Sequence, residues 1–149
     1  MASESGTAGT TTPPGRVHRY ACRVRWSDVD TYGHVNNVKY FEYYQEARIA
    51  FLSGLADGLP SGEASGVVVA RIDVDYRRPI LFRTEPFEIQ TWVSRVGRSS
   101  YDLQAEIRDG DEVLSRAHAV VVGFDPQRQR SRPLSDTERT RLHALLAPA

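Results

Sequence analysis

The period of the apolar residues limits the possible folds more than any other feature, because it changes along the chain. Between about residues 36 and 55, apolar side chains recur at every third or fourth position, which is the pattern of one helix face. A helix of that length extends roughly 30 Å. Its end is predicted at Ser53-Gly54 and the Asp57-Gly58-Leu59-Pro60 cluster. The face comprises Val38, Phe41, Tyr44, Ala47, Phe51 and Leu55.

Elsewhere apolar and polar residues alternate, which is the period of a strand with one buried face. The first strand is predicted from Tyr20 to Trp26. The second begins after Gly66, and its buried face would be formed by Val68, Ala70, Ile72, Val74 and Tyr76. Gly97-Arg98 and Asp109-Gly110, a pair that suits a primed hairpin turn, divide three further strands. We expect these strands to form an antiparallel meander over about 86–96, 99–109 and 112–124.

The predicted order is therefore one strand, one long helix and four strands. A single helix whose apolar face needs cover, beside a five-stranded antiparallel sheet, indicates an α+β fold in which the sheet wraps around the helix. We divide the chain into a disordered tail (1–16), one domain (17–134) and a short C-terminal helix with its tail (135–149). Pairing of exposed sheet edges in a homodimer would protect those edges. The terminal helix is predicted from the capping-box pattern Ser135-Asp136-Thr137-Glu138 ahead of Leu142, Leu145 and Leu146.

Composition excludes several classes of function. A chain of 149 residues provides about one domain. Nineteen basic and nineteen acidic residues cancel, so the overall charge indicates neither a nucleic acid nor a membrane as partner. Cys22 is the only cysteine, and no spacing typical of metal ligands occurs, so we expect no metal. Without a signal-peptide core or an apolar run of ~20 residues, a cytoplasmic protein is expected.

The stretch DVDTYGHVNNVKYFEYY, residues 28–44, concentrates polar residues at the start of the predicted helix. The first turn of a helix has unpaired N–H groups and the positive end of the dipole, so it attracts an oxygen that carries negative charge. Asn36 or Asn37 could simply cap the helix. Alternatively, the N–H of Asn37 could polarise a carbonyl group while a nearby carboxylate attacks the carbon or activates water.

Two carboxylates compete for that role. Asp30 is well placed, because Gly33 lets the loop fold tightly enough to bring this carboxylate near the start of the helix. Asp28 is the competitor, and both groups could instead be solvated or paired with nearby arginines. His34 could orient the aspartate, act as an acid or base near neutral pH, or hydrogen-bond the loop.

The segment SDVDTYGHVNNVKYFEYYQEAR resembles the Asp-x-x-Gly-His-Val-Asn-Asn-x-x-Tyr signature of hot-dog-fold acyl-CoA thioesterases, in the 4-hydroxybenzoyl-CoA thioesterase-like family. The resemblance implies a hot-dog fold, a five-stranded antiparallel sheet wrapped around one long central helix. It implies that Asp30 is the nucleophile or general base and that the N–H of Asn37 polarises the thioester carbonyl. Active sites of this family lie at dimer interfaces, so the resemblance implies a homodimer or a higher homo-oligomer, a tetramer or hexamer.

The expected function is hydrolysis of an acyl-CoA thioester to the free acid and coenzyme A, which enters as part of the substrate with no other cofactor. By the resemblance, the turn Gly97-Arg98-Ser99-Ser100 lies where the family contacts coenzyme A, and Arg98 suits a phosphate. An ordinary hairpin turn is the alternative. The catalytic residues are expected to be Asp30, His34 and Asn37. Contacts with the substrate are expected from Gly33, Tyr40, Val68, Arg98, Ser99 and Ser100.

Other functions stay open. HVNNVKY also resembles plant acyl-ACP thioesterases, although these carry an asparagine at the position of Tyr32. A non-catalytic acyl-CoA-binding protein could keep the same fold, and hot-dog dehydratases use a histidine with a separate acid. Other hot-dog enzymes take their carboxylate from the central helix, so Glu42 and Glu46 are reserve candidates, unless they form surface pairs such as Glu42 with Lys39. Aromatic, short-chain and medium-chain acyl groups are all compatible with the pattern.

Overall fold

The structure is a computed structural model that describes residues 16–57 and 66–146. The predicted N-terminal tail lies outside the described residues except for Arg16, and so does most of the cluster predicted to end the long helix. The elements, in chain order, are β1 (His18–Cys22), the 3-10 helix η1 (Trp26–Asp28), α2 (Lys39–Ala56), β2 (Val67–Tyr76), β3 (Phe87–Val96), β4 (Ser100–Asp109), β5 (Glu112–Asp125), β6 (Arg130–Ser131) and α3 (Asp136–Leu145).

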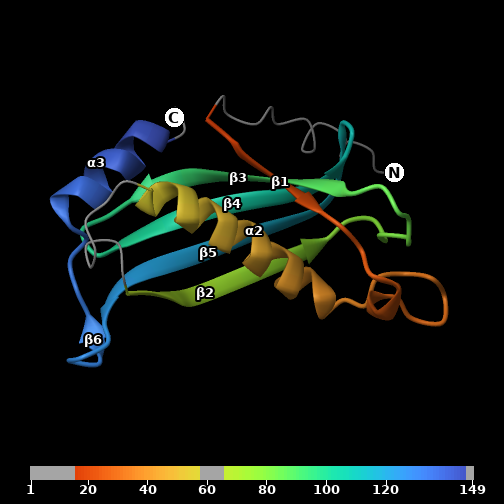
Figure 1. Ribbon diagram of the computed structural model, residues 1–149, viewed down its shortest axis with the longest axis horizontal. Helices are drawn as coiled ribbons and strands as arrows, with labels where there is room; N and C mark the ends of the chain where they lie inside the picture. Colours follow the sequence, from red (N-terminus) through yellow and green to blue (C-terminus); the bar gives the residue numbers. More distant parts are fainter. Residues whose placement is uncertain (1–15, 58–65, 147–149) are drawn as a thin grey trace, which may run out of the picture.

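The strands form one antiparallel sheet in the order β1-β3-β4-β5-β2, and β6 pairs with the end of β5. The sheet curves around α2, which crosses its concave side (Figure 1). The predicted α+β fold, a sheet wrapped around one long helix, is therefore confirmed. The short β6 adds a sixth strand to the five predicted, and its two residues are exposed, so no apolar alternation reveals it.

At the N-terminal end of α2, the residues that are buried differ from those predicted. Val38 and Phe41 are 62% and 40% exposed, respectively. Tyrosines take their place, because each buried hydroxyl near this end finds a hydrogen-bond acceptor in the protein. The residues of α2 that are buried against the sheet are Tyr40, Tyr43, Tyr44, Ala47 and Phe51.

The first strand also differs from its prediction. β1 ends at Cys22, and Trp26 lies in η1 with 75% of its surface exposed, its ring edge against Phe82 at a centroid distance of 5.1 Å. Val24 remains buried after the strand has ended. The alternation of apolar and polar residues therefore predicts too long a strand, because buried Val24, in the loop after β1, continues the two-residue period.

The second strand lies at an edge of the sheet and has a bulge between Val69 and Arg71. The bulge interrupts the predicted alternation. Val68 and Val69 are 39% and 41% exposed, and Tyr76 is 48% exposed. Ala70 is exposed too, so the predicted burial of Val68, Ala70 and Tyr76 is wrong for a single chain. Ile72 and Val74 are partly buried, as predicted.

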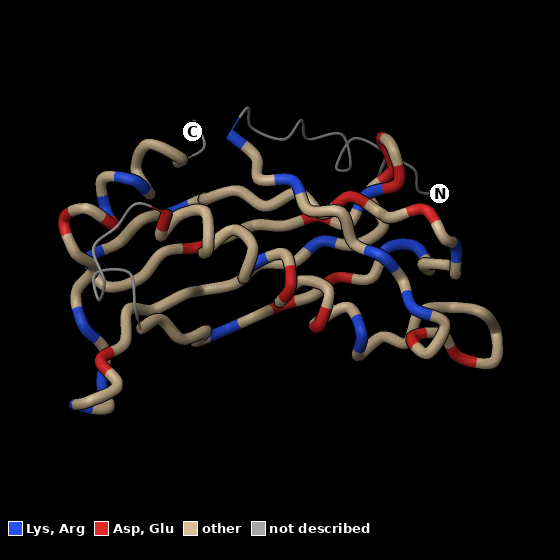
Figure 2. The backbone as a smooth tube through the Cα atoms, in the orientation of Figure 1, with Lys and Arg blue, Asp and Glu red and all other residues tan. Residues whose placement is uncertain are grey.

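The C-terminal half agrees closely with the predictions. β3, β4 and β5 begin and end within one residue of the expected ranges. The loop between β4 and β5 has a positive φ of 61° at Gly110, as the predicted hairpin turn requires. Ser135 accepts a hydrogen bond from the N–H of Glu138 and caps α3, which buries Leu142. Residues of both charge signs lie along the strands and loops (Figure 2). No helix in the described ranges has the length and apolarity needed to span a membrane.

Candidate functional site

The loop before α2 is a small, closed hairpin. Val29 and Val35 form an antiparallel bridge, and the N–H of Asp30 donates to the carbonyl of His34 at 2.8 Å. At the tip, the N–H of Gly33 donates to the carbonyl of Asp30 at 3.0 Å, with a φ of 79° at Gly33. This left-handed conformation favours glycine, and it confirms that Gly33 lets the loop fold tightly.

A neighbouring segment of the chain holds this hairpin in place. The N–H of Val35 donates to the carbonyl of Ile80 at 2.8 Å, and His34 forms a bridge with Leu81. The N–H of Phe82 donates to the carbonyl of Gly33 at 3.4 Å. Backbone pairing with residues 80–82 therefore fixes the position of the hairpin, independently of side-chain contacts.

The carboxylate of Asp30 is exposed and oriented by its own loop. Its Oδ1 accepts hydrogen bonds from the N–H groups of Tyr32 at 2.9 Å and His34 at 3.2 Å. His34 thus contacts Asp30 through its backbone, while its imidazole ring lies 6.5 Å from the ring of Tyr32. Asp30 is consequently a solvent-facing carboxylate with one oxygen held in a fixed direction.

The other carboxylate of the motif has a different environment. The side chain of Asp28 is fully buried, and its Oδ2 accepts hydrogen bonds from the Tyr43 hydroxyl at 2.7 Å and from the N–H of Arg25 at 3.0 Å. Its Oδ1 lies 3.9 Å from the Lys39 ammonium. Burial, and then the hydrogen bond to Asp28, raise the pKa of the Tyr43 hydroxyl above its usual value. Asp28 is therefore a structural anchor and not a solvated loop carboxylate.

Asp28 also connects to the start of the helix through its backbone. Its carbonyl accepts a hydrogen bond from the N–H of Asn36 at 2.8 Å. The pair of Asp28 with Tyr43 thereby holds the residues that precede α2. Reasoning from the sequence missed Tyr43, although a tyrosine on a buried helix face requires a partner for its hydroxyl, and that requirement was a usable signal.

The two asparagines at the start of α2 have separate roles. The Oδ1 of Asn36 accepts a hydrogen bond from the N–H of Val38 at 3.0 Å, and its carbonyl accepts one from the N–H of Lys39, so Asn36 closes the turn that leads into α2. The N-cap position of α2 is Val38, which has no side-chain cap, so neither asparagine is the helix cap that the sequence suggested. The carbonyl of Asn37 accepts a hydrogen bond from the Tyr76 hydroxyl of β2 at 2.9 Å. The N–H of Asn37 has no hydrogen-bond partner among residues 16–57 and 66–146. This donor is free to bind an oxygen from outside the chain.

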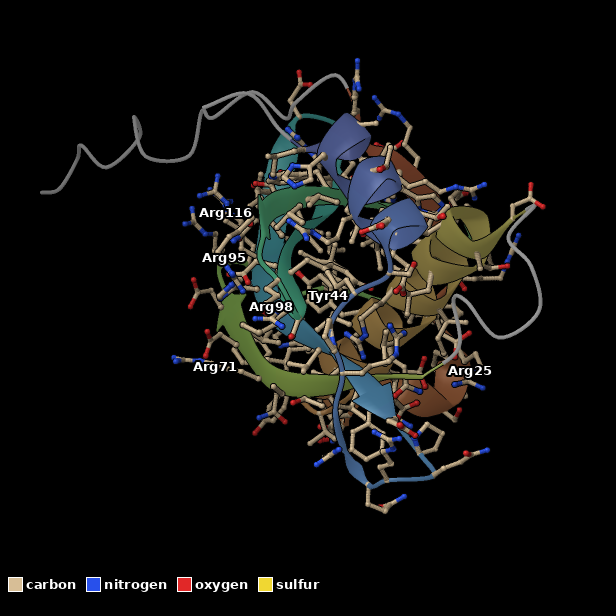
Figure 3. The ribbon with its side chains drawn as sticks, turned by 90° about the vertical axis from the view of Figure 1, so that its left-hand side faces the viewer. Arg25, Tyr44, Arg71, Arg95, Arg98 and Arg116 are labelled. Carbon is tan, nitrogen blue, oxygen red and sulfur yellow. The ribbon has the colours of Figure 1, made fainter. Side chains whose placement is uncertain are left out.

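Tyr40, the predicted substrate contact on the helix, is buried within the protein, and so is its neighbour on the helix, Tyr44. The ring of Tyr40 packs edge to face on Tyr76 with a centroid distance of 4.7 Å. Tyr44 lies between α2 and the sheet (Figure 3), and its hydroxyl donates to Ser115 at 2.7 Å. The cavity beside Tyr44 has a volume of about 20 Å³, which is about enough for one water molecule. The interior of one chain therefore offers little space for an acyl group there.

The remaining predicted residues lie at the opposite end of the sheet. Val68 and Ser100 both pair with Val122 of β5, one on each side, and the N–H of Gly123 donates to the carbonyl of Ser99 at 2.8 Å. Tyr76 lies eight positions after Val68 along β2, a span of roughly 26 Å. Within one chain, the structure brings Asp30, Gly33, His34, Asn37 and Tyr40 together at one end, and Val68, Arg98, Ser99 and Ser100 at the other.

At that second end, Arg98 lies exposed at the turn between β3 and β4. Its carbonyl accepts a hydrogen bond from the N–H of Leu134, and its guanidinium has no partner within the described part of the chain. The Oγ of Ser100 accepts a hydrogen bond from Arg95 at 2.8 Å. Figure 3 shows Arg98 near Arg95 when the molecule is viewed from this end. The turn thus presents positive charge to solvent.

The reserve carboxylates of α2 lie beside the cleft between β1 and the helix. Glu42 pairs with Lys39 at 3.1 Å, as predicted for a surface ion pair, and with Arg25 at 3.8 Å. Glu46 lines the same cleft and is exposed. In the described ranges, no group of three or more histidine, cysteine, aspartate or glutamate side chains is arranged to hold a metal ion.

Comparisons with known proteins agree on one family. Residues 24–142 match the family model of the thioesterase-like superfamily. The uncharacterized protein YsmA of Bacillus subtilis (strain 168) is 32% identical over 123 residues, which cover 80% of this chain and 82% of that protein.

Solved structures support the same grouping. A thioesterase from Thermus thermophilus, complexed with coenzyme A and Zn, is 32% identical, with a TM-score of 0.74 over 87% of this chain and 93% of that one. A predicted thioesterase from Bacillus stearothermophilus has a TM-score of 0.78 over 89% of this chain and 99% of that one. At 23% identity, this second likeness concerns the fold alone.

Proposed function

The chain belongs to the thioesterase-like superfamily, and from that premise we propose that it hydrolyses an acyl-CoA thioester to the free acid and coenzyme A. The observation that carries the proposal is the arrangement of one loop. An exposed carboxylate with a fixed orientation, Asp30, precedes by seven residues a backbone N–H without a partner, that of Asn37. Hydrolysis of a thioester needs both groups: one that delivers an oxygen nucleophile and one that stabilises the negative oxygen.

In the proposed mechanism, the thioester carbonyl oxygen accepts a hydrogen bond from the N–H of Asn37, near the positive end of the α2 dipole. Asp30 either attacks the carbonyl carbon itself or removes a proton from an attacking water molecule. The carbon–sulfur bond then breaks, and the sulfur of coenzyme A leaves as a thiolate that takes up a proton. If water attacked, the acyl group is released directly as a carboxylate. If Asp30 attacked, the acyl group forms a mixed anhydride with Asp30, and a water molecule hydrolyses this anhydride to release the carboxylate and restore Asp30. One such backbone donor contributes about 3 kcal/mol to stabilisation of the transition state.

His34 has a supporting role in this proposal. Its backbone N–H holds the carboxylate of Asp30, and its bridge with Leu81 ties that contact to the body of the protein. The left-handed Gly33 provides close access of the substrate to the loop, because it has no side chain there. Tyr40 supports the position of Tyr76, whose hydroxyl binds the carbonyl of Asn37.

We further propose that the complete site forms between two chains of a homodimer, which could assemble into a tetramer or hexamer. The edge strand β2 is ten residues long, and Val68, Val69 and Tyr76 are exposed on it. If two β2 strands pair antiparallel, the Val68 end of one chain lies beside the Tyr76 end of the other. The partner's Arg98, Ser99 and Ser100 would then approach the Asp30 loop, where they would bind the phosphates and pantetheine of coenzyme A.

The state of the one cysteine bears on the compartment of the protein. Cys22 is a buried, free thiol, which is compatible with a reducing compartment such as the cytoplasm. We therefore propose a cytoplasmic enzyme that acts on acyl-CoA dissolved in the same compartment. The chemistry uses only Asp30, backbone donors and water, with coenzyme A as part of the substrate.

The proposal is tested by release of free thiol from a panel of aromatic and short- to medium-chain acyl-CoA substrates. The wild-type protein and Asp30→Asn are compared at matched thermal stability. We expect turnover on at least one substrate and a loss of about a hundredfold or more in Asp30→Asn, because the amide is neither a nucleophile nor a base. Equal turnover by the two proteins would refute the role of Asp30. No release from any substrate would leave a binding protein or a carrier-protein thioesterase as the better description.

A further inference from the structure

An apolar cleft lies at the end of α2 that is remote from the Asp30 loop. It is bordered by the last turns of α2, the beginning of β1 and α3, which meet in this part of the fold (Figure 1). The cleft has a volume of about 550 Å³, within the usual range of small-molecule sites. We call it the α2–α3 cleft. Its apolar lining comes from Val17, Phe51, Leu55, Ala144 and Leu145.

The charged residues of the α2–α3 cleft have one sign. Arg16 and Arg141 line it, and among residues 16–57 and 66–146 no acidic residue does. Arg141 uses its Nη1 to donate to the carbonyls of Leu55 and Asp57, at the end of α2. The other N–H groups of Arg141 have no partner within residues 16–57 and 66–146. The cleft therefore combines apolar walls with free cationic donors.

His18 adds a polar group inside the same cleft. Its ring packs edge to face on Phe51 at a centroid distance of 6.1 Å, and burial lowers its pKa. The Nδ1 atom of His18 is buried and has no hydrogen-bond partner in the described part of the chain. A buried ring nitrogen without a partner is costly, and a polar ligand group would satisfy it.

Gly54 keeps the cleft open. It lies within α2 and lines the cleft, and a Cβ atom built on it would meet no atom within 4 Å. Neither a close contact nor a left-handed backbone accounts for glycine at this position. Glycine is, after proline, the least favourable residue inside a helix. Its effect here is to leave space that a larger side chain would occupy.

We propose that the α2–α3 cleft binds the anion of a free medium-chain fatty acid, with the alkyl chain on the apolar walls and the carboxylate at Arg16 and Arg141. The two arginines favour a carboxylate ligand over an uncharged one, because a guanidinium is a preferred partner of a carboxylate. The fifteen residues before Arg16, MASESGTAGTTTPPG, contain one large apolar side chain, Met1, and so are poorly suited to fill the cleft.

This site is distinct from the proposed catalytic one. Phe51, the first residue of α2 that lines the cleft, lies twelve positions after the start of the helix at Lys39, which is roughly 18 Å along the axis. Binding there depends neither on Asp30 nor on hydrolysis. The proposal thus goes beyond thioester hydrolysis, and it gives the protein a second site, for a carboxylate of the class that such hydrolysis releases.

The test is isothermal titration of the full-length protein with decanoate, with 1-decanol as the uncharged probe. Gly54→Phe and Ala144→Phe each fill the cleft, from different helices, and Gly54→Ala is the matched control for the helix. We expect each phenylalanine variant to weaken decanoate binding about tenfold or more, and Gly54→Ala to keep it. Arg16→Gln should weaken decanoate binding without affecting decanol.

Two results would overturn the proposal. One is the absence of decanoate binding to the wild-type protein. The other is binding that survives unchanged in both phenylalanine variants, with circular dichroism spectra that match the wild type. Because the experiment measures binding and not turnover, either result leaves the proposed hydrolysis to be judged by its own assay. Loss of thiol release in Asp30→Asn, with decanoate binding retained, would separate the two sites directly.

Discussion

Asp28 and Asp30 are two positions apart, yet burial gives them opposite roles. Asp30 is exposed, whereas the side chain of Asp28 has no exposed surface. A buried carboxylate needs donors, because its removal from water is otherwise very unfavourable. The Tyr43 hydroxyl and the N–H of Arg25 provide them to Oδ2. The Oδ1 atom has no hydrogen-bond partner in the described part of the chain, but the Lys39 ammonium lies 3.9 Å from it. Asp28 thus stabilises the loop on which Asp30 and Asn37 are carried.

This account predicts that Tyr43→Phe destabilises the protein. The substitution removes one donor from a buried charged acceptor, which costs about 1.5–3 kcal/mol of unfolding free energy. Urea denaturation followed by circular dichroism measures the change. Tyr32→Phe is the matched control, since this tyrosine is exposed and its substitution should change stability by less than about 0.5 kcal/mol. Equal effects of the two substitutions would contradict the anchoring role of Asp28.

The sequence located the loop correctly but could not assign its residues fully. The tight turn at Gly33 follows from local backbone chemistry and is confirmed. The expected asparagine cap is not found, because Asn36 closes the turn before α2 and the N-cap position is Val38. The burial of Asp28 depends on Tyr43, fifteen residues away, and on how α2 packs. A local motif contains no information on such a contact. The catalytic roles of Asp30, His34 and Asn37 stay predictions.

Among the elements, α2 shows why an apolar period is an incomplete guide. A count of apolar residues selected Val38 and Phe41, which are exposed, and omitted Tyr40 and Tyr43, which are buried. Tyrosine is amphipathic, so its burial depends on whether its hydroxyl finds a partner. That partner is supplied by tertiary structure. Strands β3 to β5 were predicted well because local turn residues and alternation specify a meander.

α3 is stabilised by a buried ion pair as well as by its capping box. Glu138 pairs with Arg132 at 2.9 Å, and its carboxylate also accepts a hydrogen bond from the N–H of Ser135. Burial alone would raise the pKa of Glu138, but the hydrogen bonds from Arg132 and Ser135 outweigh this effect and lower the pKa below its usual value. The ionised form therefore stabilises the folded state.

From this shift we predict a pH-dependent effect of Glu138→Gln. A group with a lowered folded pKa contributes stability above its unfolded pKa, about 4.3, and loses it as the pH falls through the folded value. Glu138→Gln should thus cost about 2 kcal/mol at pH 7, and the difference from wild type should shrink below about pH 4. Urea denaturation across this pH range measures it. Asp136→Asn, an exposed residue of the same turn, is the control. A difference that does not vary with pH would contradict the pair.

In the whole molecule, the two edges of the sheet are unequal. β1 has five residues, whereas β2 has ten, with exposed Val68 and Val69. A long edge strand with apolar residues pairs readily with another strand. The sequence predicted an apolar face of five residues on β2, and a single chain leaves three of them, Val68, Ala70 and Tyr76, exposed. A second chain that covers this edge would explain why β2 carries apolar residues that a single chain leaves exposed.

We therefore predict that Val69→Lys weakens dimerisation, because a charged side chain on an edge strand opposes strand pairing. Sedimentation equilibrium should show a shift toward monomer, and thiol release should fall with it. Ala21→Lys on the opposite edge strand is the matched control and should leave the oligomeric state unchanged. An unchanged oligomeric state in Val69→Lys would show that β2 is not the dimer edge.

The central claim of this account is that the N–H of Asn37 stabilises the oxyanion of a thioester. The direct measurement is the kcat of Asn37→Pro, which removes this N–H, beside Asn37→Ala, which keeps it. Proline is tolerated at the start of a helix, so both variants should fold. We predict near wild-type kcat in Asn37→Ala and a loss of about a hundredfold or more in Asn37→Pro. Equal kcat values in two folded variants would contradict the claim.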